Sequence, residues 1–215
     1  MTLRTLSALT LLLGGLGSPA LADDQQPALK ILHSSITEDA CEVVSGDYGA
    51  PEAMMHVISH CNGPGDWTVV LHEYASFQRI ALRHGDEAAP DPLPMKIFGR
   101  YGAIGEQIEW IEIDGDLKGA TVWFEEDIPS DRFERAANLY AIALKPEDTP
   151  SACLISRTEF GQKRGVSHAA RLSIELMADD WTCGDDEMLE FTPETTQGKP
   201  YADAVRSAAS LHGEP

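Results

Sequence analysis

The stretch "QIEWIEIDGDLKGATVWFEED" (residues 107–127) decides the fold expected for this chain. Two runs rich in β-branched and aromatic residues flank "DGDLKG" (114–119), whose Asp and Gly residues suit a turn with positive φ angles. The stretch therefore predicts a β-hairpin. The two aspartates could also suggest a calcium loop, but the alternate acids and the later bidentate glutamate of an EF-hand are missing.

Further strands are predicted on both sides of this hairpin. "DWTVVLHEY" (66–74) and "FQRIALRHG" (77–85) alternate between two faces, with Ile80 and Leu82 facing inward. "NLYAIALK" (138–145) and "SACLISRTEF" (151–160) predict two more strands. "EAAPDPLPMK" (87–96) holds three prolines, so we expect an irregular connector there.

Two helices are predicted near the C-terminus. Apolar residues recur at helical spacing in "SHAARLSIELMADDW" (167–181), where Ser167 suits the N-cap position, and in a C-terminal helix at about 200–212. Strands joined by short turns and followed by helices predict an α+β fold with a mainly antiparallel sheet. A regular βαβ alternation is missing, which argues against a doubly wound nucleotide-binding fold.

The first 22 residues have the features of a secretory signal peptide. Arg4 precedes a short apolar core, and "SPALA" ends in the small-x-small pattern that signal peptidase recognises. We therefore expect one disulfide-stabilised domain at 23–215, periplasmic or secreted. The apolar core is far shorter than the ~20 residues that span a bilayer. We expect no membrane insertion after cleavage.

The chain is strongly acidic, with 35 Asp and Glu residues against 16 Lys and Arg residues and a net charge of −19. Loss of the signal peptide would remove one arginine and no acid. Such a charge disfavours nucleic acid and anionic membrane surfaces as partners. Acidity mostly serves solubility, but it also suits a cationic partner: a basic protein, a small cationic ligand such as a polyamine, or a metal ion.

Four cysteines, Cys41, Cys61, Cys153 and Cys183, lie in the part predicted to be exported. An even count in an oxidising compartment predicts two disulfides, for which three pairings are possible. Locality favours Cys41–Cys61 with Cys153–Cys183, because each pair lies within one local unit. A zinc site is the alternative, although C-x-x-C spacing is missing.

The stretch "HVISHC" (56–61) raises the question of a copper or zinc site at His56 and His60. On a helix, residues four apart lie ~5–6 Å from each other and could share an ion. On a strand they lie ~13 Å apart, which is too far for metal–ligand bonds of ~2 Å. The metal hypothesis therefore depends on whether this segment is a helix, and a strand is the favoured prediction.

No motif predicts a reaction or a cofactor. The glycines of "GRYGAIGEQIEW" (99–110) precede a strand rather than open a helix, unlike a phosphate-binding loop. The nucleophile elbow G-x-S-x-G is missing, and "FEEDIPSD" (124–131) is expected to be solvated charge. An unrecognised enzyme stays open, with candidate residues on adjacent predicted strands: His72, Glu73, His84 and Asp86.

The order of "HSSITEDACEVV", "HCNGPGDWTVVLHE", "IEW", "GATVWF" and "ACLISRTEF…SHAARLSIELMADDWTC" resembles a group of uncharacterised exported proteobacterial proteins. The resemblance covers roughly residues 33–187. It implies the local cysteine pairing and a strand that enters Cys61, but no activity. "PEAMMHVISHC" is less strand-like than the group's pattern, and the C-terminal helix lies beyond the match.

Taken together, these patterns predict a non-catalytic binding or interaction module. A metal-binding protein that uses His56 and His60 is one alternative, and an unrecognised enzyme is the other.

Overall fold

The computed structural model describes residues 28–49, 51, 55–88, 90–96, 101–128, 134–160 and 165–212. The predicted signal peptide, residues 1–22, lies outside these residues. In the described part of the chain, no helix has the length and apolar character needed to cross a membrane.

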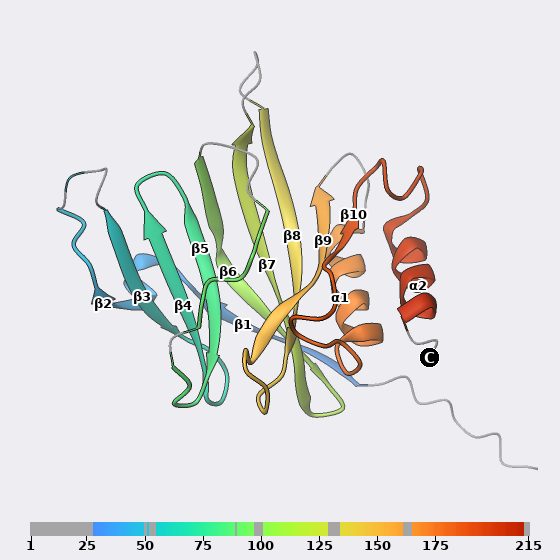
Figure 1. Cartoon of the computed structure of the whole chain (residues 1–215), viewed down its shortest axis with the longest axis horizontal. Helices are drawn as coiled ribbons and strands as arrows, with labels where there is room; N and C mark the ends of the chain where they lie inside the picture. Colours follow the sequence, from blue (N-terminus) through green and yellow to red (C-terminus); the bar gives the residue numbers. More distant parts are fainter. Residues whose placement is uncertain are drawn as a thin grey trace, which may run out of the picture.

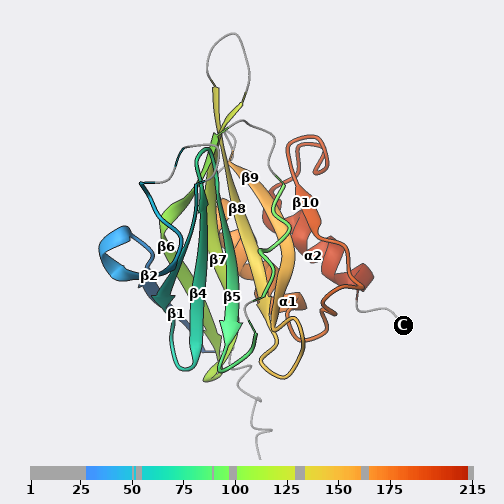
Figure 2. The same cartoon turned by 60° about the vertical axis from the view of Figure 1, so that its left-hand side comes forward.

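The strands form two sheets that face each other (Figures 1 and 2). The large sheet has the order β1-β6-β7-β8-β9-β10 and is antiparallel except for the parallel β9–β10 pair. Its strands are β1 (Leu29–Ser35), β6 (Tyr101–Ile113), β7 (Asp116–Ile128), β8 (Glu134–Leu144), β9 (Ala152–Phe160) and β10 (Leu189–Phe191). The small sheet, all antiparallel, is β2 (Cys41–Ser45), β3 (His56–Asn62), β4 (Trp67–Tyr74) and β5 (Gln78–His84).

Helices α1 (Val166–Met177) and α2 (Tyr201–His212) lie beside the large sheet on the side away from the small sheet, and a short 3-10 turn, η1 (Glu38–Ala40), precedes β2 (Figure 1). The small sheet, the large sheet and the helices thus form three layers. The α+β fold with a mainly antiparallel sheet is confirmed.

The predicted hairpin is the β6–β7 pair. Asp114 and Gly115 have φ angles of 54° and 94°, and Ile113 pairs with Asp116 across the two-residue turn. Positive φ at both central residues is what a type I′ turn requires, and the Asp-Gly sequence supplies it. β6 begins at Tyr101, before the stretch that predicted it, whereas β7 ends at Ile128, one residue after it. In the order of the large sheet, the β6–β7 pair lies near the centre.

Period-2 alternation divides the large sheet between two cores. On β6, Trp110 faces the small sheet and Ile111 faces the helices, and both are fully buried. Ile80 and Leu82 of β5 are buried in the core between the sheets, as predicted. On the other face, Glu109 of β6 forms a bidentate ion pair with Arg171 of α1, whose Nη2 atom lies 2.8 Å from the carboxylate. This ion pair links α1 to the large sheet.

Both predicted helices are present, with one correction at each end of α1. Its N-cap is Gly165, in a left-handed conformation with φ 96°, so the prediction that Ser167 caps the helix is wrong. Glycine adopts this conformation without a steric penalty. The helix ends at Met177 rather than 181. Two aspartates, Asp179 and Asp180, follow it, and negative charge disfavours extension of a helix at its C-terminus.

Candidate functional site

All four cysteines form disulfides in the local pairing, Cys41–Cys61 and Cys153–Cys183. Cys41 and Cys61 lie directly opposite each other on β2 and β3. Cys153 of β9 is tied to Cys183 beyond α1, so this bond fastens the helical layer to the large sheet. The alternative zinc site is thereby overturned, because both thiol pairs are oxidised. The two disulfides indicate an oxidising, extracellular compartment.

"HVISHC" lies in β3, so the condition for a shared ion at His56 and His60 is not met. Both side chains are on the outer face of the small sheet, four strand residues or ~13 Å apart. The structure therefore does not bring this pair together. Residues 52–54, where a helix start was considered, lie outside the described residues.

His56 instead meets His72 of β4 on the outer face. The Nε2 atom of His56 lies 3.3 Å from the Nδ1 atom of His72. In the β3–β4 register, His56 pairs with Tyr74 and Ile58 pairs with His72, so the two histidines are diagonal neighbours. The His56 ring also stacks on Tyr74, with ring centroids 4.4 Å apart and an interplanar angle of 4°.

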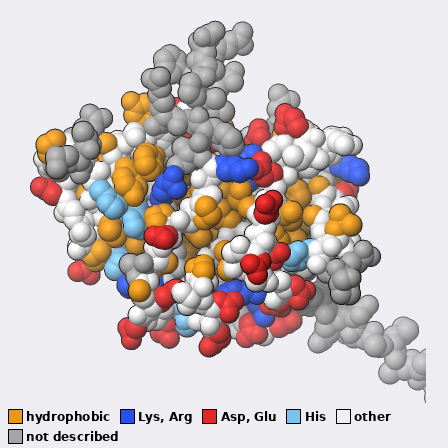
Figure 3. All heavy atoms as spheres, viewed as in Figure 1, with side chains coloured by type: hydrophobic (Ala, Val, Ile, Leu, Met, Phe, Trp, Pro, Cys, Tyr) orange, Lys and Arg blue, Asp and Glu red, His pale blue; other side chains and the backbone are white. Residues whose placement is uncertain are grey.

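The two histidines differ in their surroundings. His56 is exposed, whereas the His72 side chain is buried. The pKa of His72 is lowered, mainly because burial disfavours the charged ring and also because His56 lies close by. The negative charge of Asp91 raises this pKa and offsets part of the effect. Figure 3 shows histidine side chains gathered over the small sheet, next to apolar side chains.

A pocket of about 320 Å³ opens between the two sheets, a size in the range of small-molecule sites. The small sheet contributes Ser59, Leu71 and Glu73 from its inner face, and β6 contributes Ile104, Gly105 and Glu106. The rest of the described lining comes from the β1–β2 region, the following loop and β5: Ile36, Thr37, Glu38, Cys41, Tyr48 and Gln78. The charged residues in this lining are three glutamates. We call it the intersheet pocket.

Glu73 is the carboxylate of the intersheet pocket that the protein holds in place. One of its oxygens accepts a short hydrogen bond from the Tyr48 hydroxyl, and the other accepts one from Gln78 Nε2 at 2.9 Å. The bond to Glu73 raises the pKa of Tyr48, because the carboxylate disfavours a tyrosinate beside it. Gln78 is fixed in turn, since its Oε1 accepts from the backbone N–H of Ile104 at 2.9 Å.

A second pocket of about 250 Å³ lies nearby, where the β4–β5 turn meets β6. Its lining includes Glu125, Glu126 and Asp127 of β7. Glu126 is only 2% exposed. The interpretation of 124–131 as solvated charge is therefore wrong at this position. Val122 and Phe124 face the intersheet core, and strand alternation places Glu126 on the same face.

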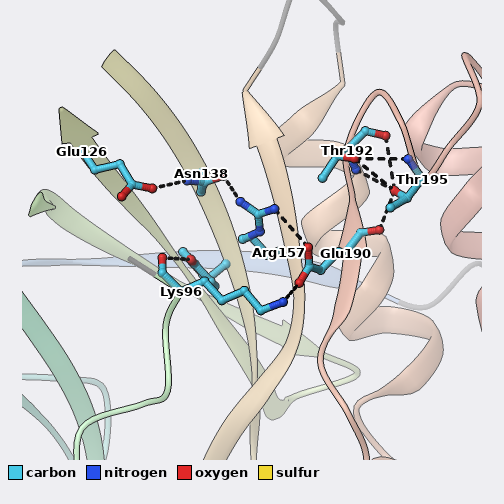
Figure 4. A network of polar contacts seen from close by, with 8 residues as sticks. Lys96, Glu126, Asn138, Arg157, Glu190, Thr192 and Thr195 are labelled. Atoms are coloured by element: carbon cyan, nitrogen blue, oxygen red, sulfur yellow. Dashed lines mark hydrogen bonds and ion pairs between the residues drawn. The ribbon is translucent and has the colours of Figure 1, made fainter. Parts of the chain in front are cut away.

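Glu126 begins a polar network that has members on four strands, β7 to β10, and reaches the proline-rich connector (Figure 4). Asn138 donates to Glu126 at 3.4 Å and accepts from Arg157 at 3.0 Å. Arg157 also donates to Glu190 of β10 at 3.1 Å, and Lys96 of the connector pairs with the same glutamate. The network links β10 to β9 and fastens the connector to the large sheet, which is a structural role.

The four residues considered for an unrecognised enzyme do not share one site. His72 is on the outer face of the small sheet, whereas Glu73 lines the intersheet pocket. His84 packs against Trp67, with ring centroids 5.0 Å apart, and Asp86 is exposed in the following turn. Among the described residues, no group of three or more His, Cys, Asp or Glu side chains is arranged to hold a metal ion.

Sequence reasoning missed Tyr48, Gln78 and Glu126 as site residues. Strand alternation carried through β7 would have indicated Glu126. No local pattern indicates Tyr48, which reaches Glu73 from a loop 25 residues earlier.

Comparison with known proteins found no matching family model, no matching curated protein and no matching solved structure. The resemblance to exported proteobacterial proteins therefore stays a prediction, and the geometry of the pockets carries the functional proposal.

Proposed function

We propose that this protein is an exported, non-catalytic binding module that takes a small organic cation, such as a di- or polyamine, into the intersheet pocket. The observation that carries this proposal is the held carboxylate of Glu73 inside a concave site whose charged lining is entirely acidic.

The electrostatics favour a cation over other ligands. The three glutamates add their attraction for positive charge, and water screens Glu73, which is half-buried, less than the exposed Glu38 and Glu106. Glu73 accepts hydrogen bonds on both oxygens yet keeps further lone pairs for an ammonium group. Leu71 and Ile104 can contact the methylene groups between two amines.

The rigidity of the pocket also supports binding. The Cys41–Cys61 disulfide forms part of its wall, and the Gln78–Ile104 hydrogen bond joins the small sheet to β6 at its other side. A preformed site loses less conformational freedom when the ligand binds. The predicted signal peptide and the two disulfides support a periplasmic or secreted location for this module.

Isothermal titration calorimetry of the purified chain with putrescine and spermidine tests the proposal. We expect saturable binding of the amines, and none of the neutral isostere 1,4-butanediol. Glu73→Gln should weaken amine binding at least tenfold, because it removes the central charge and keeps the shape.

Glu175→Gln is the matched control. Glu175 is exposed on α1, across the large sheet from the pocket, and this variant changes the net charge by the same amount. Its affinity should stay within twofold of the wild type. Equal loss in both variants would show that general acidity, rather than the intersheet pocket, attracts the amine.

A further inference from the structure

We propose that His56 and His72 form a binding site for a first-row transition-metal ion of the Cu²⁺/Zn²⁺ class on the outer face of the small sheet. This site is separate from the intersheet pocket, because the two histidines face away from the core between the sheets.

The spacing of the two nitrogens suits one shared ion. Two imidazole nitrogens bound at ~2.0–2.1 Å in tetrahedral geometry lie about 3.3–3.4 Å apart. His56 Nε2 and His72 Nδ1 are separated by 3.3 Å, which is long for a hydrogen bond between them. An ion bound by both atoms, lying to one side of the line between them, would therefore replace a weak contact with two coordinate bonds.

The surroundings hold both rings in position. His56 stacks flat against Tyr74, and Tyr74 in turn stacks on Phe77 with ring centroids 4.6 Å apart. The His72 side chain is 8% exposed, and its Nε2 atom is buried without a hydrogen-bond partner in the described part of the chain. The ion would bind the other ring nitrogen of His72, Nδ1, so the buried Nε2 atom takes no part in the proposed site.

The charges nearby select the class of ion. Arg79 pairs with His72 across β4–β5, and Arg83 lies further along the same face, so simple attraction for a cation is weak here. The negative charge of Asp91 raises the pKa of His72 and so partly offsets the two arginines. Binding must then depend on the bonds to imidazole, which Cu²⁺ and Zn²⁺ form readily and Mg²⁺ and Ca²⁺ do not.

Two histidines leave coordination positions for water, so we expect weaker binding than at sites with three or four protein ligands. By the general order of divalent affinities, Cu²⁺ should bind more tightly than Zn²⁺. Calorimetric titration of the full chain with CuCl₂ and ZnCl₂, with MgCl₂ as the negative control, measures this order.

Two variants and two matched controls locate the site. His56→Ala and His72→Gln should each weaken Cu²⁺ binding at least tenfold. His60→Ala, on the same strand and face, and His168→Ala, exposed on α1, should change it less than threefold. Unchanged binding by His56→Ala, or equal loss in His56→Ala and His60→Ala, would overturn the proposal.

A failure of His72→Gln to fold would also abolish metal binding, so NMR of the wild-type protein provides a test that needs no variant. Long-range ¹H–¹⁵N correlation spectra report which ring nitrogen each histidine uses. Addition of Zn²⁺ should shift Nε2 of His56 and Nδ1 of His72. Shifts confined to other histidines would exclude this pair, and amine binding at Glu73 would be untouched by that result.

Discussion

His56 on β3 and His72 on β4 meet with their ring nitrogens 3.3 Å apart, although 16 residues separate them in the sequence. Their meeting depends on the β3–β4 register, in which Ile58 lies opposite His72. A register shift of one residue would send one of the rings to the opposite face of the sheet. The pair is thus a product of strand pairing, and the helical spacing of His56 and His60 plays no part in it.

The affinity of the intersheet pocket for spermidine should fall as salt rises. Electrostatic attraction between a polyamine and exposed carboxylates such as Glu38 and Glu106 is screened once the Debye length shrinks from ~10 Å at 0.1 M to ~3 Å at 1 M salt. We expect at least a tenfold loss between 0.05 and 0.5 M NaCl by calorimetry. A salt-independent affinity would contradict a charge-based site.

The two disulfides should differ in their effect on binding. Replacement of either cysteine pair by alanine should lower the free energy of unfolding by about 2–5 kcal/mol, measured by urea denaturation. Only the Cys41→Ala/Cys61→Ala variant should also weaken amine binding, because Cys41 lines the intersheet pocket. Equal amine affinity in both double variants would show that this disulfide does not shape the site.

Arg157→Met should destabilise the fold by about 3–5 kcal/mol, because it leaves the buried Asn138 without a donor and removes one of the two cations paired with Glu190. Arg157 is 5% exposed. The control is Arg206→Met on α2, whose ion pair with Asp203 is exposed and should be worth less than about 1 kcal/mol. Chemical denaturation of the two variants gives the comparison, and similar losses would contradict a structural role for the network.

Tyr140 should make the fold sensitive to alkali. Burial raises the pKa of Tyr140 to about 12 from its ordinary value of 10.0. A raised pKa means that the stabilising contribution is fully present below pH 10 and is lost as the pH rises through 12. Below pH 10, Tyr140→Phe should cost about 1 kcal/mol, because the hydroxyl donates to the Lys96 carbonyl at 3.0 Å.

Between pH 10 and 12 the stability of the wild type should fall more steeply than that of Tyr140→Phe, so that the difference closes. Urea denaturation at a series of pH values measures it. Tyr101→Phe, at a residue 56% exposed, is the control and should follow the wild type throughout. If the free energy of unfolding fell in parallel for Tyr140→Phe and the wild type, a raised pKa of Tyr140 would be contradicted.

The sequence by itself determined the local structure of this protein. Asp114-Gly115 specifies the hairpin turn and alternation specifies that Ile80 and Leu82 face inward, because both depend on neighbours in the chain. The short sequence separation of each cysteine pair, in contrast, only favoured the pairing that the structure shows. Only the tertiary structure decided how the strands are divided between two sheets and which distant strands pair, such as β1 with β6. The β3–β4 register placed His72 beside His56, and packing between distant segments brought Tyr48 to Glu73, and neither contact leaves a periodic signal in the sequence. Alternation along β7 does indicate the face of Glu126, but only the packing of the two sheets decided that this face is buried.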